Sequence, residues 1–251
     1  MNPTQLALQD KLALVTGAGG TMGRAVVQAL LDDGCRVAMV DLAPAPLRAL
    51  EVLHGERVAG FVCDIGDPDA VLSTHQKITQ RFGTVDVLVN NAGILSNHKV
   101  EATTLFEWRQ VLAANLDGAL FWAQAVVPAM KAQRWGRIVN TSSLAAKTGG
   151  LTAGTSYSVS KGAMSALTFS LARELAAFGV TCNAVAPAYV RTPMVTEQLS
   201  DEQRRELLKQ IPVGRFCEPE EFAHTVRFLA SPMSGFITGE ILDLNGGLLM
   251  D

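Results

Sequence analysis

The chain has 251 residues, 48% of them hydrophobic, which is enough to bury the core of one large domain. Lys and Arg total 21 against 24 for Asp and Glu, so the chain lacks the basic field that attracts nucleic-acid backbones and anionic membranes. We therefore expect a small-molecule partner and neither nucleic acid nor membrane as a target.

The cysteines and the apolar segments set further limits. The four cysteines are widely spaced, with no Cys-x-x-Cys pair and no histidine cluster beside them, so we expect buried thiols, no disulfide framework and no metal site. The first residues lack the basic and apolar regions of a signal peptide. The most apolar stretch, Ala119–Met130, is shorter than the ~20 residues of a membrane span. These features predict a cytoplasmic protein.

Short runs rich in Val, Ile and Leu alternate with longer segments of helical spacing. The predicted strands are Leu12–Thr16, Arg36–Val40, Val58–Cys63, Val85–Val89, Arg137–Thr141, Val180–Val185 and Glu240–Leu244. The predicted helices include Gly23–Asp33, Asp69–Phe82, Leu105–Ala132 and Ser160–Phe178. Because the strands are apolar on both faces, helices should cover both sides of a parallel sheet. We predict a single α/β domain, a doubly wound Rossmann-like sheet of about seven strands, with functional residues just after the strands.

A glycine-rich turn follows the first predicted strand and leads into an apolar helix. Glycines let the backbone approach a pyrophosphate, and the start of the helix offers it free N–H groups and a favourable dipole. The turn contains Gly17, Gly19, Gly20, Thr21, Met22 and Gly23. Such a turn is weak evidence by itself, since a plain tight turn can have the same composition.

Asp41 ends the second predicted strand and bears on the identity of the cofactor. It lies about 20 residues beyond the turn, where a carboxylate accepts hydrogen bonds from the adenosine ribose and repels a 2′-phosphate. Neither Gly20 nor Leu42 is an arginine that would reverse this preference. We therefore predict NAD as the cofactor; the alternative is a solvated aspartate at a strand end.

Tyr157 and Lys161 are four residues apart, so in a helix their side chains share one face. A tyrosine with its usual pKa of about 10 is a poor base at neutral pH, and a nearby ammonium favours the phenolate. The pair predicts Tyr157 as the proton-exchanging residue, although Tyr157 alone could be a core aromatic. Ser143 follows the fifth strand, where a hydroxyl can donate to a substrate carbonyl. No Gly-x-Ser-x-Gly elbow surrounds Ser143, which argues against a hydrolase.

The chain resembles the short-chain dehydrogenase/reductase family over essentially its whole length. The motifs that carry the resemblance occur in family order: Thr16–Gly23, Asp64, Asn90-Asn91-Ala92-Gly93, Asn115, Ser142-Ser143, Tyr157-x-x-x-Lys161 and Pro187-x-x-Val190-x-Thr192. Each motif can arise by chance, but the ordered set is highly specific. The resemblance implies hydride transfer between a secondary alcohol or ketone and the nicotinamide, with Tyr157 as general acid and base.

The resemblance also implies individual roles. Asp64 would bind the adenine amino group beside the backbone N–H of Ile65, and Val190 and Thr192 would meet the nicotinamide carboxamide. Asn115 would hold a water that links the lysine to solvent. The implied cofactor contacts beyond the turn and Asp41 are Asp64, Ile65, Asn91, Ala92, Gly93, Tyr157, Lys161, Pro187, Val190 and Thr192.

Two positions depart from the family pattern. Thr21 stands where the family usually has glycine, so its side chain should either shift the turn onto Gly19 and Gly20 or add a hydroxyl donor near the pyrophosphate. The spacing from Ser143 to Tyr157 is a residue longer than in many relatives, which makes Ser142 the alternative to Ser143.

The final third of the chain is similar to 3-oxoacyl-carrier-protein reductases, which are generally NADP-dependent and meet an acidic carrier through basic residues. Asp41 opposes that cofactor preference. Phe178 replaces a frequent arginine of that surface, although Arg134 and Arg137 remain. We therefore rank an NAD-dependent dehydrogenase of a small or medium secondary alcohol first and a 3-oxoacyl-carrier-protein or acyl-CoA reductase second. A catalytically idle NAD-binding scaffold ranks third.

Two further expectations concern a lid and the assembly. The polar stretch Pro187–Pro219 is long for this fold, so residues 188–218 form either a substrate lid or a solvated decoration. The helices Leu105–Ala132 and Ser160–Phe178 carry more apolar positions than one sheet-facing stripe needs. In the family these helices pack about a two-fold axis and the C-terminal segment forms a second interface, which implies a homotetramer. Residues 246–251 should be clamped there or should fray.

Overall fold

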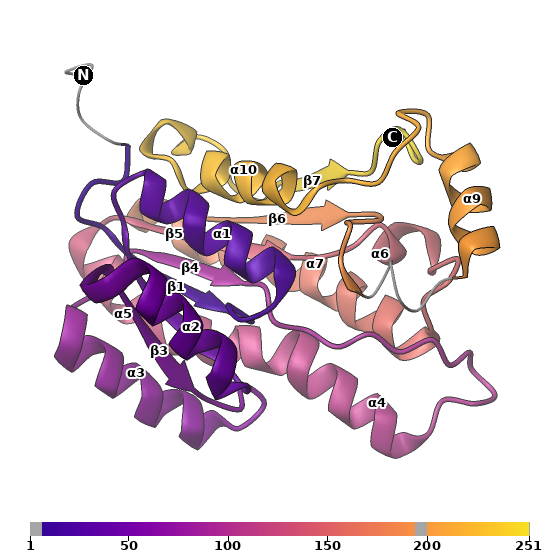
Figure 1. The fold of residues 1–251 in the computed structure, drawn as a ribbon. Helices are drawn as coiled ribbons and strands as arrows, with labels where there is room; N and C mark the ends of the chain where they lie inside the picture. Colours follow the sequence, from indigo (N-terminus) through magenta and orange to yellow (C-terminus); the bar gives the residue numbers. More distant parts are fainter. Residues whose placement is uncertain (1–6, 194–199, 251) are drawn as a thin grey trace.

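A parallel sheet of seven strands forms the centre of the molecule (Figure 1). The computed structural model describes residues 7–193 and 200–250 of the chain. The strands are β1 (Leu12–Thr16), β2 (Arg36–Asp41), β3 (Val58–Val62), β4 (Val87–Asn90), β5 (Gly136–Thr141), β6 (Val180–Pro187) and β7 (Ile241–Leu244). Their order across the sheet is β3-β2-β1-β4-β5-β6-β7, and this arrangement confirms the predicted fold class.

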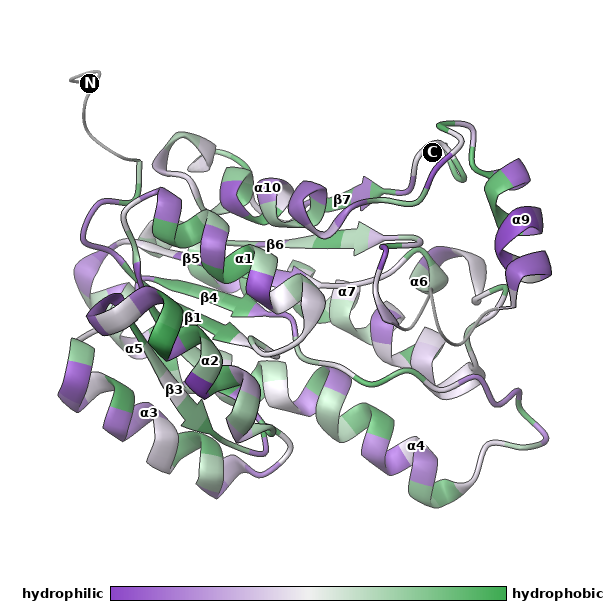
Figure 2. Cartoon of the chain, in the orientation of Figure 1, coloured by the Kyte–Doolittle hydropathy of each residue, from purple (hydrophilic) through white to green (hydrophobic). Residues whose placement is uncertain are grey.

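Most of the α-helices lie in two layers, one on each side of the sheet, whereas α9 stands apart from both (Figure 1). The helices are α1 (Thr21–Asp32), α2 (Pro44–His54), α3 (Pro68–Phe82), α4 (Leu105–Leu112), α5 (Gly118–Gln133), α6 (Ala145–Thr148), α7 (Thr155–Leu175), α9 (Asp201–Gln210) and α10 (Pro219–Ala230). α1, α2 and α10 pack on one face with Val26, Leu47 and Phe222 in the core, and α3, α5 and α7 pack on the other with Ile78 and Trp122. The central strands are largely hydrophobic, whereas α9 is largely hydrophilic (Figure 2).

The direction of winding reverses beside β1. This strand pairs with β2 on one side and with β4 on the other, because the chain returns across the sheet after β3. A reversal of this kind leaves a crevice at the carboxyl ends of the two central strands, where ligands bind in open α/β sheets.

The predicted helix Leu105–Ala132 is present as a helical run from Leu105 to Gln133, but the run contains a π-helical turn that the sequence pattern did not predict. A π-helical turn, η2 (Ala113–Asp117), separates α4 from α5. Hydrophobic spacing cannot reveal one additional residue in a turn, and such insertions often occur at functional sites. The run Leu105–Gln133, with a mean hydropathy of 1.2, is long and apolar enough to cross a membrane. It is weak evidence for a membrane span, because a core helix passes the same test and Trp122 is completely buried.

α7 begins five residues before the predicted Ser160, at Thr155. Its first turns contain Ser and Thr instead of periodic apolar residues, so the sequence pattern starts too late. The earlier start places Tyr157 in the first turn of the helix and Lys161 in the second. The predicted helical spacing of this pair therefore exists in the structure.

The long connection after β6 has a small core of its own. It consists of Leu207, Ile211 and Phe216, with Tyr189, Leu208 and Leu248 packed against it. The backbone N–H of Val213 also donates to the Gly246 carbonyl at 3.1 Å. The C-terminal segment thus packs on the predicted lid of its own subunit. Residues 194–199 of that lid and residue 251 lie outside the described residues.

Candidate active site

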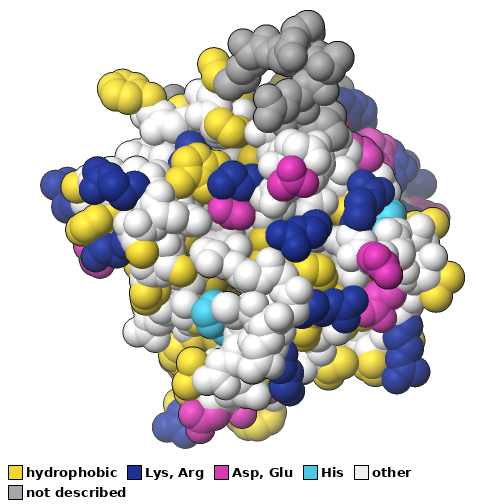
Figure 3. Space-filling model, turned by 90° about the vertical axis from the view of Figure 1, so that its left-hand side faces the viewer, with side chains coloured by type: hydrophobic (Ala, Val, Ile, Leu, Met, Phe, Trp, Pro, Cys, Tyr) yellow, Lys and Arg dark blue, Asp and Glu magenta, His cyan; other side chains and the backbone are white. Residues whose placement is uncertain are grey.

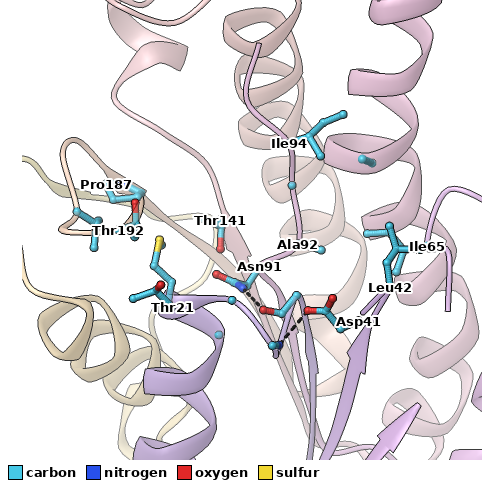
Figure 4. A pocket seen from close by; sticks show the side chains of 18 of the residues that line it. Thr21, Asp41, Leu42, Ile65, Asn91, Ala92, Ile94, Thr141, Pro187 and Thr192 are labelled. Carbon is cyan, nitrogen blue, oxygen red and sulfur yellow. Dashed lines mark hydrogen bonds between the residues drawn. The ribbon is translucent and has the colours of Figure 1, made fainter. Parts of the chain in front are cut away.

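A cavity of about 680 Å³ opens at the carboxyl ends of the central strands (Figure 4). It brings together eighteen residues that the sequence predicted: Gly17, Gly19, Gly20, Thr21, Met22, Gly23, Asp41, Asp64, Ile65, Asn91, Ala92, Gly93, Ser143, Tyr157, Lys161, Pro187, Val190 and Thr192. Asn115 is the predicted site residue that does not line it. The individual roles of these residues remain predictions.

The glycine-rich turn needs glycine for steric reasons. Gly17 has a φ of +64°, and a Cβ there would lie 2.8 Å from the Cα of Ala92. A Cβ on Gly23 would lie 2.0 Å from the Gly17 carbonyl oxygen. Beyond the turn, α1 begins with neither a side-chain cap nor an acidic residue in its first turn, so its N–H groups are available to a phosphate.

Asp41 is held rigidly at the edge of the cavity (Figure 4). Its carboxylate accepts hydrogen bonds from the backbone N–H groups of Gly19 at 2.9 Å and Ala43 at 3.0 Å. Sequence reasoning overlooked Arg24, whose Nε donates to the Gly19 carbonyl at 2.7 Å. Arg24 does not line the cavity, where Lys161 is the one cation among the described lining residues.

Thr16 and Asn91 join the two loops at the switch point. The Thr16 hydroxyl accepts from the backbone N–H groups of Asn91 and Ala92, each at 3.1 Å. The Asn91 side chain donates in return to the carbonyls of Thr16 at 3.1 Å and Gly17 at 3.3 Å. These hydrogen bonds hold the two loops together at the base of the cavity. Thr21 lies at the edge of the cavity, and its side chain is exposed. The side chain therefore does not cover the turn at Gly19 and Gly20.

Lys161 is buried and Tyr157 is half-buried in the cavity wall. The ammonium nitrogen of Lys161 lies 5.7 Å from the centre of the Tyr157 ring and donates to the Thr141 carbonyl at 2.7 Å. Burial lowers the pKa of Lys161 to about 8. Burial raises the pKa of Tyr157, while a hydrogen bond with Ser143 lowers it. The lowering of the Tyr157 pKa that we expected from Lys161 is therefore not seen, because the effect of burial outweighs that of the hydrogen bond with Ser143.

The two serines after β5 have different partners. The Ser142 hydroxyl donates to the Lys161 carbonyl at 3.0 Å and bonds the Ser165 hydroxyl at 2.9 Å, so it ties β5 to α7. The Ser143 hydroxyl accepts from the backbone N–H of Ala145 at 3.1 Å, and Ser143 lowers the pKa of Tyr157. This geometry favours Ser143 over the alternative Ser142 as the residue that meets a substrate oxygen.

Asn115 lies in the π-helical turn and is fully buried. Its side chain accepts from the Ile94 N–H at 2.7 Å and donates to the Ile94 carbonyl and the Ser160 hydroxyl, both at 3.0 Å. A Cβ on Gly93 would lie 3.0 Å from the Asn115 amide oxygen and 3.5 Å from the Lys161 nitrogen. Asn115 thus joins the segment after β4 to α7, and its role in a water relay remains a prediction.

Several lining residues were not predicted from the sequence. They are Leu42, Ala43, Pro46, Cys63, Ile94, Ala114, Thr141, Ala188 and Pro193. Most are apolar and carry no chemical signature. Their position directly after predicted strands is the one signal that could have identified them.

Comparison with known proteins gives consistent matches over the whole chain. A family profile described as Enoyl-(Acyl carrier protein) reductase matches residues 17–249. The 3-oxoacyl-(acyl-carrier-protein) reductase FabG of Vibrio cholerae is 37% identical over 97% of this chain and 99% of its own length. The reductase of the same name from Thermotoga maritima is 37% identical over 98% of this chain and all of its own length.

A solved structure gives a similar result. The protein from Brucella melitensis described as Short-chain dehydrogenase/reductase SDR:Glucose/ribitol dehydrogenase superposes with a TM-score of 0.91 at 32% identity. The superposition covers 99% of this chain and all of the other.

Proposed function

We propose that this chain, which belongs to the short-chain dehydrogenase/reductase family, is an NAD(H)-dependent reductase of 3-oxoacyl thioesters. It is an oxidoreductase that acts on CH–OH groups with a nicotinamide dinucleotide. When bound, the cofactor supplies or accepts the hydride. The protein contributes orientation, the proton and stabilisation of charge on the substrate oxygen.

The described residues fit such a cofactor. Gly17 and Gly23 allow the turn to pack closely against Ala92 and the start of α1, and α1 presents uncapped N–H groups to the pyrophosphate. The fixed carboxylate of Asp41 supports NAD over NADP, because it would accept ribose hydroxyls and repel a 2′-phosphate. This is the observation on which the cofactor preference rests.

The reductase relatives move the acyl substrate ahead of the small alcohol that the sequence alone ranked first. Two further observations favour a CoA thioester over a carrier protein as the acyl donor. Phe178 occupies one basic position of the expected carrier surface. Arg137 is 4% exposed and therefore cannot contact a carrier protein. Of the basic residues expected on the carrier surface, Arg134 remains. The dehydrogenase name of the Brucella neighbour keeps small polyols as the second candidate.

Tyr157 and Ser143 would act on the same substrate oxygen. In reduction, hydride reaches the ketone carbon and Tyr157 gives its proton to the oxygen that becomes the hydroxyl. Ser143 donates a hydrogen bond to that oxygen as its negative charge develops. Lys161, whose pKa burial lowers to about 8, can exchange protons near neutral pH and so help to restore the phenol.

Oxidation of NADH in the presence of acetoacetyl-CoA tests the substrate. Parallel assays with NADPH, with an acetoacetyl carrier protein and with small ketones and polyols should give the highest kcat/KM for NADH and the CoA thioester. A higher kcat/KM for a polyol with NAD would establish the second candidate instead, and turnover with NADPH alone would reject the cofactor preference.

We also propose a homotetramer. Two separate groups of large apolar side chains are exposed, one on α4, α5 and α7 and one beside the edge strand β7. The first group consists of Leu105, Phe106, Leu120, Val159 and Phe169, and the second consists of Phe228, Met233 and Phe236. Two such surfaces support two isologous contacts and closed symmetry. Sedimentation at micromolar concentration tests this, and a fully active monomer would reject it.

A further inference from the structure

Two segments that flank the catalytic helix lie against each other. Residues 94–99 follow β4, and residues 149–154 lead into α7. The backbone N–H of Gly154 donates to the Ser96 carbonyl at 2.6 Å, and that of Thr155 donates to the His98 carbonyl at 3.0 Å. A Cβ on Gly154 would lie 2.4 Å from the His98 carbonyl oxygen, so this contact requires glycine. The start of α7 is therefore in direct contact with the 94–99 segment.

Lys99 strengthens the same contact. Its ammonium donates to the carbonyls of Gly150 at 3.1 Å, Leu151 at 3.4 Å and Ala153 at 2.6 Å. These carbonyls belong to the loop that ends two residues before Ser156. These charge-assisted hydrogen bonds hold the loop against the 94–99 segment.

Glu107 of α4 lies where these segments meet. One carboxylate oxygen of Glu107 bonds the His98 ring nitrogen Nδ1 at 2.5 Å. The other accepts from the Ser156 hydroxyl at 3.1 Å and from the Ser96 hydroxyl. Hydrogen bonds from Ser96 and His98 lower the pKa of Glu107, which keeps its carboxylate ionised and accepting at neutral pH.

The start of α7 depends on these outside contacts. Its N-cap residue, Gly154, has no side chain with which to bond the first N–H groups of the helix, and no side-chain cap is formed. Ser156 is fully buried and immediately precedes Tyr157. The Glu107–Ser156 hydrogen bond is thus a side-chain link between a neighbouring helix and the turn that carries the phenol.

We infer that Glu107 is a positioning residue for Tyr157: its carboxylate joins Ser96 and His98 to Ser156 and thereby fixes the first turn of α7. The inference rests on the proposed function only in making Tyr157 the proton donor. Displacement of a reacting group by even about 1 Å can lower a rate strongly, so loss of this link should be seen in catalysis before it is seen in folding.

Glu107→Gln tests the inference, because glutamine keeps the shape of the side chain but has one accepting oxygen instead of two. Ser156→Ala removes the link from the other side and carries the test if Glu107→Gln fails to fold. Glu101→Gln is the matched control, since Glu101 is an exposed carboxylate on the same connection before α4. The chain has two tyrosines, so the ¹⁹F spectrum of protein labelled with 3-fluorotyrosine contains two resonances, which Tyr189→Phe assigns.

We expect Glu107→Gln and Ser156→Ala to shift or broaden the Tyr157 resonance and to lower kcat about tenfold. KM and the Kd of NAD should change less than twofold, and Glu101→Gln should match the wild type in every measurement. An unchanged Tyr157 resonance in both link variants would overturn the inference, whether or not kcat falls. The spectrum reports the position of Tyr157 even if another residue proves to be the acid, so failure of the proposed function would be recognised separately.

Discussion

A cation is buried near each end of the parallel strands, which we call the carboxyl edge and the amino edge of the sheet. The two cations differ in their hydrogen bonds and in their function. Lys161, at the carboxyl edge, is 3% exposed and Arg137, at the amino edge, is 4% exposed. Lys161 has the Thr141 carbonyl as its hydrogen-bond partner, and burial lowers its pKa to about 8. Arg137 donates to the carbonyls of Gly136 at 2.9 Å, Gly179 at 3.4 Å and Ser231 at 3.4 Å.

The surroundings of Arg137 complete the contrast. Its guanidinium lies 4.7 Å from the centre of the Trp135 ring, and Lys11 lies 4.2 Å from the same centre. Lys11 also pairs with Asp86 at 3.0 Å. The amino edge therefore mixes both signs of charge with apolar groups (Figure 3). An arginine stays charged when buried, whereas a buried lysine releases its proton more easily, so one edge suits cross-linking and the other suits proton exchange.

Tyr157→Phe should show the largest effect at the carboxyl edge. Loss of the phenolic hydroxyl should lower kcat by roughly 10³-fold, since general acid catalysis contributes about 10² to 10⁴. NAD binding, measured by calorimetry, should remain nearly intact because the hydroxyl acts on the substrate. A variant that kept a tenth of the wild-type kcat would move the acid role to another residue.

Arg137→Leu should affect stability instead. The substitution leaves buried carbonyls without donors, at a cost of about 3 kcal/mol in the free energy of unfolding. Urea denaturation measures this cost, and kcat of the folded fraction should stay near the wild-type value. A large loss of kcat with unchanged unfolding would mean that the amino edge has a functional role as well.

The pH dependence of unfolding should separate the two cations. The folded pKa of Lys161 is about 8, below the usual value of 10.5, so between these values the unfolded chain binds more protons than the folded one. This contribution therefore makes stability rise as the pH increases from about 8 to 10.5, by an amount of the order of 3 kcal/mol. In Lys161→Met this part of the slope should vanish, and in Arg137→Leu it should persist. Equal slopes in the wild type and Lys161→Met would contradict the assignment.

Asp41→Ala should give the smallest effect. Removal of the carboxylate relieves repulsion of a 2′-phosphate, so the ratio of kcat/KM for NADH over NADPH should fall about tenfold. Arg24→Ala should leave that ratio nearly unchanged if Arg24 serves only to brace Gly19. A ratio that rises in Arg24→Ala would show that this cation assists NADPH.

Much of the architecture was predictable because burial on both faces leaves a direct trace in the sequence. The strands of the centre are rich in buried apolar residues, and the predicted site residues that line the cavity lie at the carboxyl ends of the strands, where sheet topology places them. The start of α7 was missed because its first turn is polar. That turn is fixed by Glu107, a residue fifty positions before Tyr157 that no local pattern connects to it.

The chemistry of single groups was less predictable. Arg137 was assigned to a carrier surface, yet its strand position buries it, and an apolar strand pattern does not show which polar members are satisfied inside. The pKa of Tyr157 was expected to fall beside Lys161. It rises because desolvation depends on the packing of the whole site, whereas sequence spacing reveals only the nearest charge.

The π-helical turn Ala113–Asp117 also preserves the rotational phase of the helix that follows it, because it takes up one additional residue within a single turn. Each residue of an α-helix advances the azimuth of its side chains by about 100°, and a π turn accommodates an additional residue within one turn. Deletion of one residue there would convert the π turn into an α turn while α5 kept its phase, so Trp122, Val126 and Met130 would stay in the core. The additional residue therefore changes the backbone around Asn115 without changing the register of the core.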